Sequence, residues 1–575
     1  MRKYSRILTI ALLLVSCGPR DGVHTLQLLT TNDVHGAWFD SEYVGGKSRN
    51  SLLAVNYYVD SVRKVDGAGN VLLIDAGDCL QGDNASYYYN YVDTGTEHLF
   101  TRLVSYMKYD AVTVGNHDIE AGHAVYDRVA KELKHHGIPF LAGNAIRNDN
   151  GKPYFQPYKL FKRAGLKVLV LGYTNANNPA WMDESLWSGM HFESLIPKVQ
   201  EDVDRYTARL KPQVVIVSVH SATGEGNGRS LEGQGMDLYK TLKGVDFVVC
   251  SHDHREFKAD NGHIAIINSG NRAKYLGHGE LQVEIKHGKV ARKKISSALI
   301  RVDRRKTDPQ MKAEFKKDFD EVKAFSNKEI GALAYDLRTR DAYSGMCDYV
   351  NLIHTVCLKE SGADISFAAP LTYNGTVRAG ILIYNDLFTI YPFENQLYVL
   401  RMTGAEIKKY LEFSYNGWLA APGGDHVLNI ARRNDPRNNQ QGWSFVKRSY
   451  NFDSAAGINY TVDITKPAGQ RIKIESMADG REFNPEAEYT VAMTSYRASG
   501  AGGLLTRGAG IPEKELDGRI IRRYPEIRDI IYNYVEEYGL IDDSAMYQVK
   551  RNGKWKFIPE DTASRRIAAD LALVF

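Results

Sequence analysis

Short apolar runs alternate with amphipathic stretches over the first half of the chain, between residues 24 and 302. Five of these runs have the length and composition of buried strands: residues 71–74, 111–114, 166–171, 214–219 and 247–250. Between them, residues 124–133 place Val125, Val129 and Leu133 on one face of a helix. Residues 281–295 are predicted to form a hairpin that turns at His287 and Gly288. This half of the chain is therefore predicted to be an α/β domain.

A change in composition follows residue 302. Residues 303–330 are mostly charged except for one apolar face, which is typical of a linker helix between domains: Met311, Phe315, Phe319 and Val322. Beyond the linker we predict strands at 363–368 and 397–402. The spacing of Thr403 and Glu406 is that of a capping box, so we expect a helix to begin there.

The end of the chain carries a hairpin signal. Asn552 and Gly553 separate residues 547–551 from residues 554–557, and this dipeptide is typical of a two-residue β-turn. We therefore expect a small C-terminal appendage. The predicted organisation is a signal peptide at 1–17, the α/β domain at 24–302, a linker helix at 303–330, a second domain at 331–543 and the appendage at 544–575.

Size and charge exclude some classes of protein. The 575 residues are too many for one hydrophobic core and enough for two or three domains. The formal net charge is only +4, and no run of Lys or Arg dominates. Binding to a nucleic-acid polymer is therefore not favoured. We expect a monomer.

The N-terminus has the pattern of an export signal. Arg2, Lys3 and Arg6 precede the apolar residues 7–15, a stretch too short to span a membrane. It ends at Leu14-Val15-Ser16-Cys17, which resembles a bacterial lipobox. We expect cleavage before Cys17, lipidation of its thiol and a periplasmic protein anchored to a bacterial membrane. The alternative is an ordinary secretory signal with a coincidental cysteine.

The mature chain has four cysteines: Cys79, Cys250, Cys347 and Cys357. Export permits disulfides. Cys347 and Cys357 are predicted to lie on one helix about 15 Å apart, too far to pair. Buried free thiols are expected for all four.

Five polar motifs each follow an apolar run: Thr31-Asn32-Asp33-Val34-His35, Gly77-Asp78, Gly115-Asn116-His117-Asp118, His220 and Ser251-His252-Asp253-His254. Sites in α/β sheets form beyond the carboxyl ends of strands, so these motifs should converge. Together they supply carboxylates, an amide oxygen and imidazoles. That mixture favours a pair of hydrolytic divalent metals over a single ion.

Each motif alone is weak evidence, because a strand-end His or Asp is more often a turn residue than a ligand. On an extended backbone Asp33 and His35 would point to the same side and could share one ion. Asp78 could bridge two ions with its two oxygens. His252 and His254 could each reach a different ion. Five such motifs in one α/β domain favour the metal site.

These motifs resemble those of the calcineurin-like metallophosphoesterases, and most closely those of bacterial secreted 5′-nucleotidases and 2′,3′-cyclic-nucleotide phosphodiesterases. The resemblance implies a four-layer α-β-β-α domain followed by a smaller α/β (α+β) substrate-binding domain. It also implies two divalent ions (Mn, Zn, Mg or Ca) and attack on phosphorus by metal-bound hydroxide. One ion would bind Asp33, His35, Asp78 and His254. The other would bind Asp78, Asn116, His220 and His252, with Asp78 bridging.

His117 is not a ligand in this resemblance. It would stabilise the transition state or protonate the leaving oxygen, and it needs a carboxylate to orient it. Glu120 stands where the relatives usually have Asp, and Asp118 is nearer in sequence. We favour Glu120 over Asp118. The alternative is that both acids only begin the next helix, where negative charge is favourable.

The second half resembles the substrate-binding domain of 5′-nucleotidases. Residues 373–378 include Asn374 and Arg378, a contact for phosphate; residues 391–395 supply Phe393 and Asn395 for the base; and residues 494–500 supply Tyr496 and Arg497. The resemblance implies that the base stacks between Phe393 and Tyr496. Each ring alone is more often part of a core than of a binding site. After Gly500 the usual ribose-binding Asp is missing, and the Tyr496-Arg497 pair is closer to the cyclic-nucleotide branch.

The sequence therefore predicts an exported dimetal phosphohydrolase of the 5′-nucleotidase type that acts on nucleotides. One alternative is a 2′,3′-cyclic-nucleotide 2′-phosphodiesterase/3′-nucleotidase. A second is a nucleotide-binding lipoprotein without catalysis, which the irregular surroundings of His117 would explain. A third is hydrolysis of a non-nucleotide ester such as a sulfur-carrier thiosulfate adduct.

Overall fold

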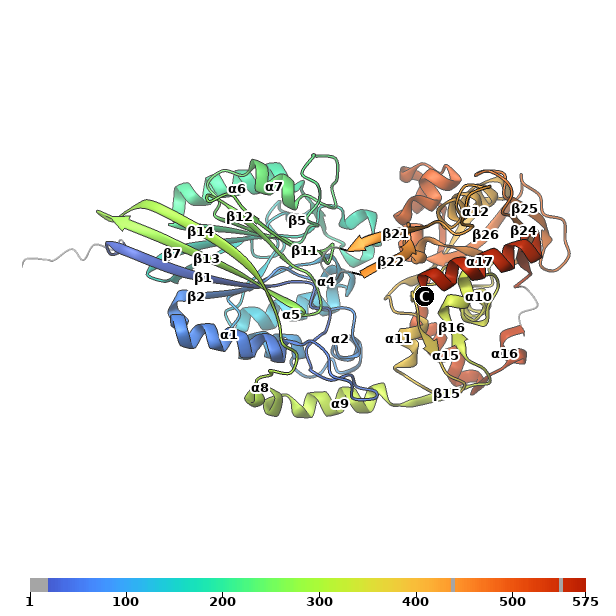
Figure 1. The fold of residues 1–575 in the computed structure, drawn as a ribbon, viewed down its shortest axis with the longest axis horizontal. Coiled ribbons are helices and arrows are strands. Elements are labelled where there is room, and N and C mark those ends of the chain that lie inside the picture. The colour runs from blue at the N-terminus through green and yellow to red at the C-terminus, as the bar shows by residue number, and fades with distance from the viewer. Residues whose placement is uncertain (1–18, 436–439, 548–551) are drawn as a thin grey trace, which may run out of the picture.

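The computed structural model describes residues 19–435, 440–547 and 552–575. The chain forms two bodies that a helical linker joins along one side (Figure 1). In the described part of the chain, no helix is long and apolar enough to cross a membrane. The N-terminal signal and Cys17 lie outside the described residues.

Two six-stranded sheets form the centre of the first domain. The first sheet has the order β14 (Lys289–Arg301), β13 (Tyr275–Lys286), β1 (Gly22–Thr31), β2 (Val71–Asp75), β3 (Ala111–Thr113) and β4 (Phe140–Leu141). The second has the order β11 (Glu256–Asp260), β12 (Ala265–Ser269), β10 (Phe247–Val249), β9 (Val214–Val219), β7 (Leu166–Tyr173) and β6 (Tyr158–Arg163). The five predicted strands and the closing hairpin are confirmed.

The sheets pack face to face, with helices on both outer sides. Between the sheets lies a core that includes Leu28, Ile74, Ile216 and Phe247. Helices α1 (Leu52–Asp66), α3 (Leu99–Tyr106) and α5 (His123–His135) pack on the first sheet, and α6 (Leu195–Leu210) and α7 (Gly235–Thr241) pack on the second. The four-layer α-β-β-α arrangement is therefore confirmed. Val125, Val129 and Leu133 are buried along α5, as their spacing predicts.

The linker consists of two helices rather than one. Helix α8 (Pro309–Glu314) ends at Phe315, whose backbone angles (φ −97°, ψ 16°) are not helical, and α9 (Lys316–Ser326) begins after it. Met311, Phe315 and Val322 are buried in the core of the first domain. The break lets Phe315 pack inward, so the linker is attached to the first domain along its apolar face.

The second domain is built on a five-stranded sheet with the order β23 (Ser454–Ala456), β17 (Ile365–Ala368), β26 (Glu488–Thr494), β20 (Gln396–Thr403) and β27 (Ile520–Glu526). Helices α10 (Asp348–Ser361), α12 (Gly404–Trp418) and α15 (Ile527–Tyr538) pack around it. The capping box is present: Thr403 Oγ accepts from Glu406 N (3.2 Å), and the Glu406 carboxylate accepts from Thr403 N (2.8 Å). The cysteines of the described chain are free, as expected, although Cys347 is only partly buried.

The predicted C-terminal appendage is wrong. Tyr547 ends helix α16 (Asp543–Tyr547), residues 548–551 lie outside the described residues, and β29 (Trp555–Ile558) pairs in parallel with β24 (Ile458–Asp463). Helix α17 (Glu560–Val574) buries Ile567 in the core of the second domain. Most of the first arm of the predicted hairpin lies outside the described residues, whereas the apolar face of α17 packs against the core of the second domain.

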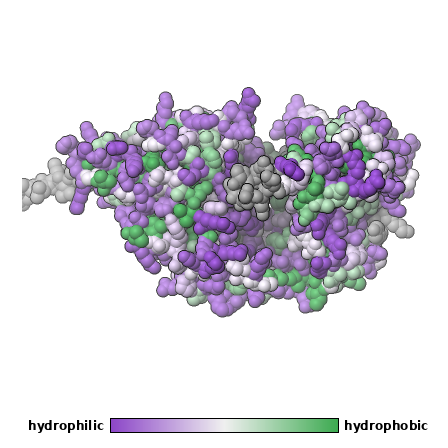
Figure 2. All heavy atoms as spheres, in the orientation of Figure 1, coloured by the Kyte–Doolittle hydropathy of each residue, from purple (hydrophilic) through white to green (hydrophobic). Residues whose placement is uncertain are grey.

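Contacts between the two bodies come from several segments. Asp183 pairs with Arg523 (3.2 Å), Tyr87 Oη donates to Asp529 (2.5 Å) and Ser499 Oγ donates to Ala180 O (3.2 Å). The hairpin of β21 (Ile430–Asp435) and β22 (Gln440–Phe445) extends from the second body toward the first (Figure 1). The surface is hollowed between the bodies, with hydrophilic residues on both sides (Figure 2).

The placement of α17 is testable by substitution. Ile567→Ala should lower the free energy of unfolding of the second domain by about 3 kcal/mol, because the side chain is fully buried. Leu573→Ala on the same helix, where the side chain is 45% exposed, should cost less than about 0.5 kcal/mol. Urea unfolding measured by circular dichroism gives both values. Equal, small effects would contradict the packing of α17.

Candidate metal centre

The candidate ligands stand just beyond the carboxyl ends of parallel strands. Asp33, Asp78 and Asn116 follow the neighbouring strands β1, β2 and β3 of the first sheet. His220 and His252 follow β9 and β10, which are neighbours in the second sheet. Because the two sheets are packed face to face, the five loops at this edge approach one another. Both sheets therefore contribute to one site, as expected for an α/β fold.

The ligand loops have an unusual backbone. Asp33, His35, Asp78, His252 and His254 all have positive φ, between 47° and 72°. Side chains other than glycine rarely adopt this left-handed region, although Asp and His do so more readily, and such residues concentrate at functional sites. The expectation that Asp33 and His35 lie on an extended backbone is therefore wrong. A tight turn, rather than strand alternation, brings their side chains together.

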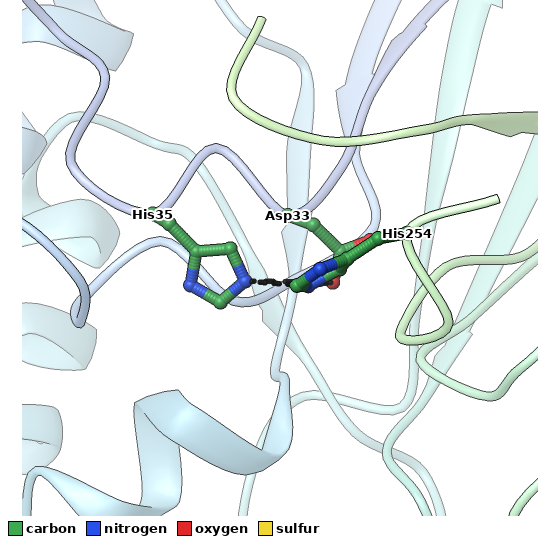
Figure 3. Close-up of side chains that lie close together, drawn as sticks. All are labelled: Asp33, His35 and His254. Carbon is green, nitrogen blue, oxygen red and sulfur yellow. Dashed lines mark hydrogen bonds and ion pairs between the residues drawn. The ribbon is translucent and has the colours of Figure 1, made fainter. Parts of the chain in front are cut away.

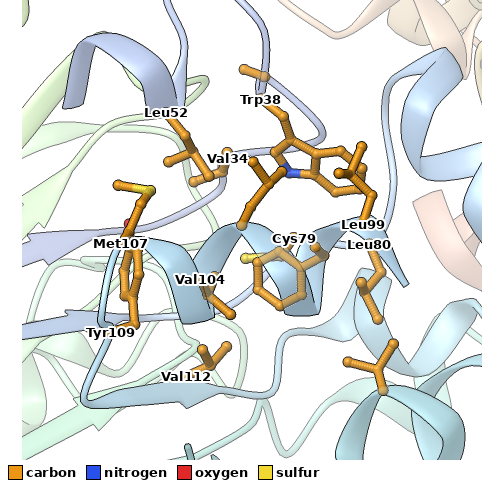
Figure 4. Close-up of a cluster of buried hydrophobic side chains, with 14 of the residues drawn as sticks. Val34, Trp38, Leu52, Cys79, Leu80, Leu99, Val104, Met107, Tyr109 and Val112 are labelled. Carbon is orange, nitrogen blue, oxygen red and sulfur yellow. The ribbon is translucent and has the colours of Figure 1, made fainter. Parts of the chain in front are cut away.

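Glycine is required beside Asp78. Gly77 has a φ of 98°, and a Cβ there would lie 2.6 Å from His220 Nδ1 and 2.8 Å from Gly115 N. The residues next to the ligands anchor these loops from below: Val34, Cys79 and Leu80 are buried in the core against α3 (Figure 4). One side of these ligand loops is therefore packed in the hydrophobic core, and the candidate ligands lie on the other side.

The first cluster consists of Asp33, His35 and His254. His35 Nε2 lies 2.9 Å from His254 Nε2, and these nitrogens lie 3.9 and 3.7 Å from Asp33 Oδ1 (Figure 3). Burial lowers the pKa of His35, and lowers that of His254 to about 4. Both rings are therefore neutral at pH 7, which is the form that binds metals.

The second cluster consists of Asp78, His220 and His252. Asn116 lies among them, with its Oδ1 2.9 Å from His220 Nε2 and 2.8 Å from His252 Nδ1. His220 Nε2 is also 3.1 Å from Asp78 Oδ2. Four of the predicted ligands therefore direct their donor atoms to one point.

Asp78 lies between the two clusters, and one of its oxygens faces both. Oδ2 is 3.1 Å from His220 Nε2 and 4.0 Å from His35 Nε2. Oδ1 instead accepts from the backbone N–H of His117 (2.9 Å). Oδ2 is therefore the Asp78 oxygen that could bridge two ions, whereas the sequence suggested that both oxygens would do so.

The second nitrogen of three imidazoles is engaged. His35 Nδ1 lies 3.2 Å from Gln81 O, His220 Nδ1 lies 2.8 Å from Ala76 O, and His252 Nε2 lies 3.2 Å from Glu232 Oε1. Carbonyl and carboxylate oxygens only accept, so each assigns a proton to that nitrogen. The opposite nitrogen of each ring then directs a lone pair into its cluster, as in metal-ligating histidines.

The charges of the site call for a cation. Burial and the neighbouring charge of Asp78 raise the pKa of Asp33. Burial lowers the pKa of His220, but Asp78 outweighs it and raises that pKa to about 9. The second cluster therefore attracts positive charge, which a proton supplies without a metal. A divalent ion in each cluster would relieve the close approach of lone pairs, and the carboxylate, amide and imidazole donors fit such ions.

The two acids near His117 have different roles. His117 Nδ1 is hydrogen-bonded to the Glu120 carboxylate. The Asp118 carboxylate instead accepts four backbone N–H groups, those of Asp78 (3.1 Å), Cys79 (2.9 Å), Leu80 (2.9 Å) and Gly115 (2.7 Å). The structure therefore brings Glu120, and not Asp118, to His117. Asp118 positions the loop that carries Asp78.

Burial lowers the pKa of His117, but the charges of Asp78 and Glu120 outweigh it and raise the pKa to about 10. Because a carboxylate only accepts, Nδ1 carries a proton and donates it in a hydrogen bond to Glu120. Nε2 remains available for another partner. His117 is thus prepared to carry a proton. Divalent ions beside Asp78 would offset part of this increase.

The candidate substrate residues are not all at the surface of the site. The Phe393 ring lies edge-on to Tyr450, with centroids 6.4 Å apart, and Tyr496 is partly buried. Asn395 is buried and lies 3.5 Å from Tyr391 Oη. Asn374 is exposed.

Two arginines are placed differently from the sequence expectation. Arg497 is buried and makes a bidentate pair with Asp453, at 2.9 and 3.0 Å. Its remaining hydrogen bonds go to backbone carbonyls, and its guanidinium lies over the Tyr496 ring (5.3 Å to the centroid), so it stabilises its own loop and is not free for substrate. Arg378 is exposed and pairs with Asp336 (2.8 Å). Local sequence could not show either ion pair, because both acids are distant along the chain.

Sequence reasoning missed three residues at the site. Trp181 stacks on the candidate ligand His252, with ring centroids 4.9 Å apart and planes inclined by 19°. Glu232 Oε1 lies 3.2 Å from Nε2 of the same imidazole. Tyr450 is the aromatic partner of Phe393. None of the three belongs to a motif, so the sequence offered no signal for them.

Two family models match the chain: calcineurin-like phosphoesterase at residues 26–256, and the 5′-nucleotidase C-terminal domain at 324–507. A 2′,3′-cyclic-nucleotide 2′-phosphodiesterase/3′-nucleotidase of Haemophilus influenzae is 22% identical, over 93% of this chain and 87% of that protein. A trifunctional nucleotide phosphoesterase of Bacillus subtilis is 23% identical over 93% of this chain, which spans 39% of that protein.

A solved structure from Staphylococcus aureus, assigned provisionally as a 5′-nucleotidase and crystallised with α-ketoglutarate, has the same fold. Its TM-score is 0.75 at 20% identity, over 93% of this chain and 99% of that one. In the present chain, the phosphoesterase model matches the first domain of the structure and the 5′-nucleotidase C-terminal model matches the second.

Metal content tests the two clusters directly. The chain equilibrated with Mn²⁺ or Zn²⁺ and then dialysed should contain two ions by mass spectrometry, because each cluster supplies its own donors. His254→Ala should reduce this to one ion. His263→Ala, an exposed histidine between β11 and β12, should leave two. Two ions in His254→Ala would contradict the assignment.

The two acids beside His117 should give opposite results. Asp118→Ala should lower the free energy of unfolding by at least about 2 kcal/mol, because buried N–H groups lose their acceptor. Glu120→Gln should change stability by less than about 0.5 kcal/mol and lower turnover of bis(p-nitrophenyl) phosphate. Chemical denaturation and the colour assay measure the two effects. Normal stability of Asp118→Ala with lost turnover would reverse the roles.

Proposed function

We propose that this chain, which belongs to the calcineurin-like phosphoesterases that carry a 5′-nucleotidase C-terminal domain, is a nucleotide phosphohydrolase of the 5′-nucleotidase type. The observation that carries the proposal is the pair of donor clusters joined by Asp78, with His117 and Glu120 beside them. A hydrolase of this family is expected to act on a phosphate ester. The attached domain supports a nucleotide as the ester.

Two divalent ions bound by the clusters would supply Lewis acids for the phosphate oxygens and lower the pKa of a coordinated water. The protein does the rest. Asp78 keeps the two clusters adjacent, Asn116 lies between His220 and His252, and Trp181 and Glu232 orient His252. Glu120 orients His117 so that Nε2 can donate a proton to the leaving oxygen.

The second domain would bind the nucleoside. The rings of Phe393 and Tyr450 lie edge-on to each other. Tyr496 lies three residues before Ser499, which contacts Ala180 of the first domain. We propose that the base stacks on Phe393, with Tyr496 on its other side, although Tyr450 is the neighbour of Phe393 in this arrangement. The ion pair of Asp183 with Arg523 supports this approach of the domains.

A second candidate is a 2′,3′-cyclic-nucleotide 2′-phosphodiesterase/3′-nucleotidase. The Haemophilus influenzae relative with that name aligns with 93% of this chain. A binding protein without catalysis is less well supported, because the hydrogen bond between Glu120 and His117 restores the dyad whose irregular sequence suggested it.

We also propose, from the N-terminal sequence alone, that the chain is exported and lipidated at Cys17 and acts as a periplasmic monomer. Mass spectrometry of the membrane fraction should show two or three acyl chains on Cys17. Cys17→Ser should release the protein into the soluble fraction.

An assay of nucleotides decides between the candidates. With Mn²⁺, Zn²⁺, Mg²⁺ or Ca²⁺, the chain should release phosphate from 5′-AMP, and His117→Ala should lower kcat by about 10²-fold or more. 3′-AMP and 2′,3′-cyclic AMP measure the second candidate. Phe393→Ala should raise KM for 5′-AMP about tenfold through lost stacking, and leave KM for bis(p-nitrophenyl) phosphate unchanged. No turnover of any nucleotide by the metal-loaded chain would falsify the proposal.

A further inference from the structure

A basic groove lies beside His254 in the first domain. Its volume is about 1130 Å³, which is the size of a whole small-molecule site and exceeds what one phosphate needs. The lining includes His254, Asn50 and four cations that carry the following argument: Arg255, Lys274, Arg301 and Arg304. All of the lining residues lie between positions 50 and 305. The groove is therefore separate from Phe393 and Tyr496.

The cations of this groove have no acidic partner. Within the described residues, no carboxylate lies within 4.0 Å of Arg255, Lys274, Arg301 or Arg304. Lys274 Nζ donates to Asn271 Oδ1 (3.2 Å), and Arg304 Nη1 donates to Ser48 O (3.4 Å). All four residues are exposed. Four like charges around one groove repel one another, and an anion between them removes that cost.

The acids that line the groove are mostly engaged. Asp253 accepts from Thr223 N (2.9 Å) and Asn268 Nδ2 (2.7 Å). Asp303 pairs with Arg305 (3.0 Å). Glu256 is the one carboxylate of the lining without a polar side-chain contact among the described residues. The groove thus retains an excess of positive charge.

The groove continues directly from the metal centre. His254 lines the groove, and its Nε2 lies 2.9 Å from His35 Nε2 in the first cluster. Arg301 pairs across the sheet with Tyr275, two residues before Gly277, which pairs with Thr30 near Asp33. A ligand whose phosphorus lies at the clusters can therefore extend into the groove without leaving the first domain.

We propose that the groove binds a second phosphate of the substrate, on the side of the scissile phosphorus that faces away from the base. This rests on the proposed nucleotide hydrolysis and extends its substrates from monoesters such as 5′-AMP to phosphate diesters and anhydrides that carry a second phosphate. Water adds to phosphorus, the bond to one ester or anhydride oxygen breaks, and that oxygen takes a proton. The second phosphate can be linked through a diester, as in a dinucleotide, or through an anhydride, as in a dinucleoside polyphosphate.

Binding measured without turnover tests the groove. Isothermal titration uses the full metal-loaded chain with His117→Ala, so that the ligand is not consumed. One arm compares the dinucleotide ApA with its 5′-phosphorylated form pApA, and the other compares 5′-AMP with ADP, whose second phosphate is linked through an anhydride. In at least one arm the additional phosphate should tighten binding at least tenfold, and the difference should shrink in 0.5 M salt.

Charge reversal assigns that difference to the groove. Arg301→Glu combined with Arg304→Glu should reduce the tenfold preference to less than threefold. Lys289→Glu combined with Arg292→Glu makes the same change in charge on two exposed residues of β14, outside the groove, and should retain the preference. A preference below threefold in both arms, or one that survives the double reversal, overturns the proposal.

The two proposals can fail separately. If the unmodified chain hydrolyses 5′-AMP and neither arm shows a preference, the groove assignment alone is wrong. If no nucleotide is hydrolysed and the preference is present and sensitive to the reversal, the groove binds phosphate and the proposed nucleotidase activity is wrong.

Discussion

The site depends on the junction between two sheets at their carboxyl edges. Ala76 O, directly after β2 of the first sheet, accepts from Ser251 Oγ (2.9 Å) and lies 2.8 Å from His220 Nδ1, and both of those residues follow strands of the second sheet. One carbonyl therefore sets the tautomer of a candidate ligand and links the sheets. Without this junction, the candidate ligands of the first sheet and those of the second sheet would not be held next to one another.

That junction concentrates metal-donor atoms. His220 Nε2, His252 Nδ1, Asn116 Oδ1 and Asp78 Oδ2 meet within a buried region. Positive charge is needed to hold them together, and without a metal a proton on His220 supplies it. The fold also accepts five left-handed residues here, which is characteristic of a functional site. Asp118 contributes by collecting four N–H groups of the surrounding loops, which fixes the backbone on either side of Asp78.

The second domain adds a different kind of constraint. Arg528 is fully buried, donates to Tyr391 O (2.9 Å) and lies 3.3 Å from the Glu394 carboxylate. It therefore fixes both ends of the segment that carries Phe393, next to the first domain. The proposed base-binding residues and the metal centre therefore lie in separate bodies, and the contacts of Asp183 and Ala180 with the second domain contribute to how the two bodies face each other.

The sequence alone determined the elements and the ligand types. Apolar runs, the capping box at Thr403 and the motifs that end strands depend on residues close in the chain, so their spacing was sufficient. Tertiary structure decided every matter that rests on distant residues. It engaged Asp118 with the backbone of the Asp78 loop, paired Arg497 with Asp453, placed Tyr450 beside Phe393 and packed α17 into a core where the local Asn-Gly signal suggested an appendage. The physical reason is that a hydrogen bond or a buried contact depends on which groups are close in space. For residues far apart in the chain, that proximity is set by the complete fold and not by local sequence.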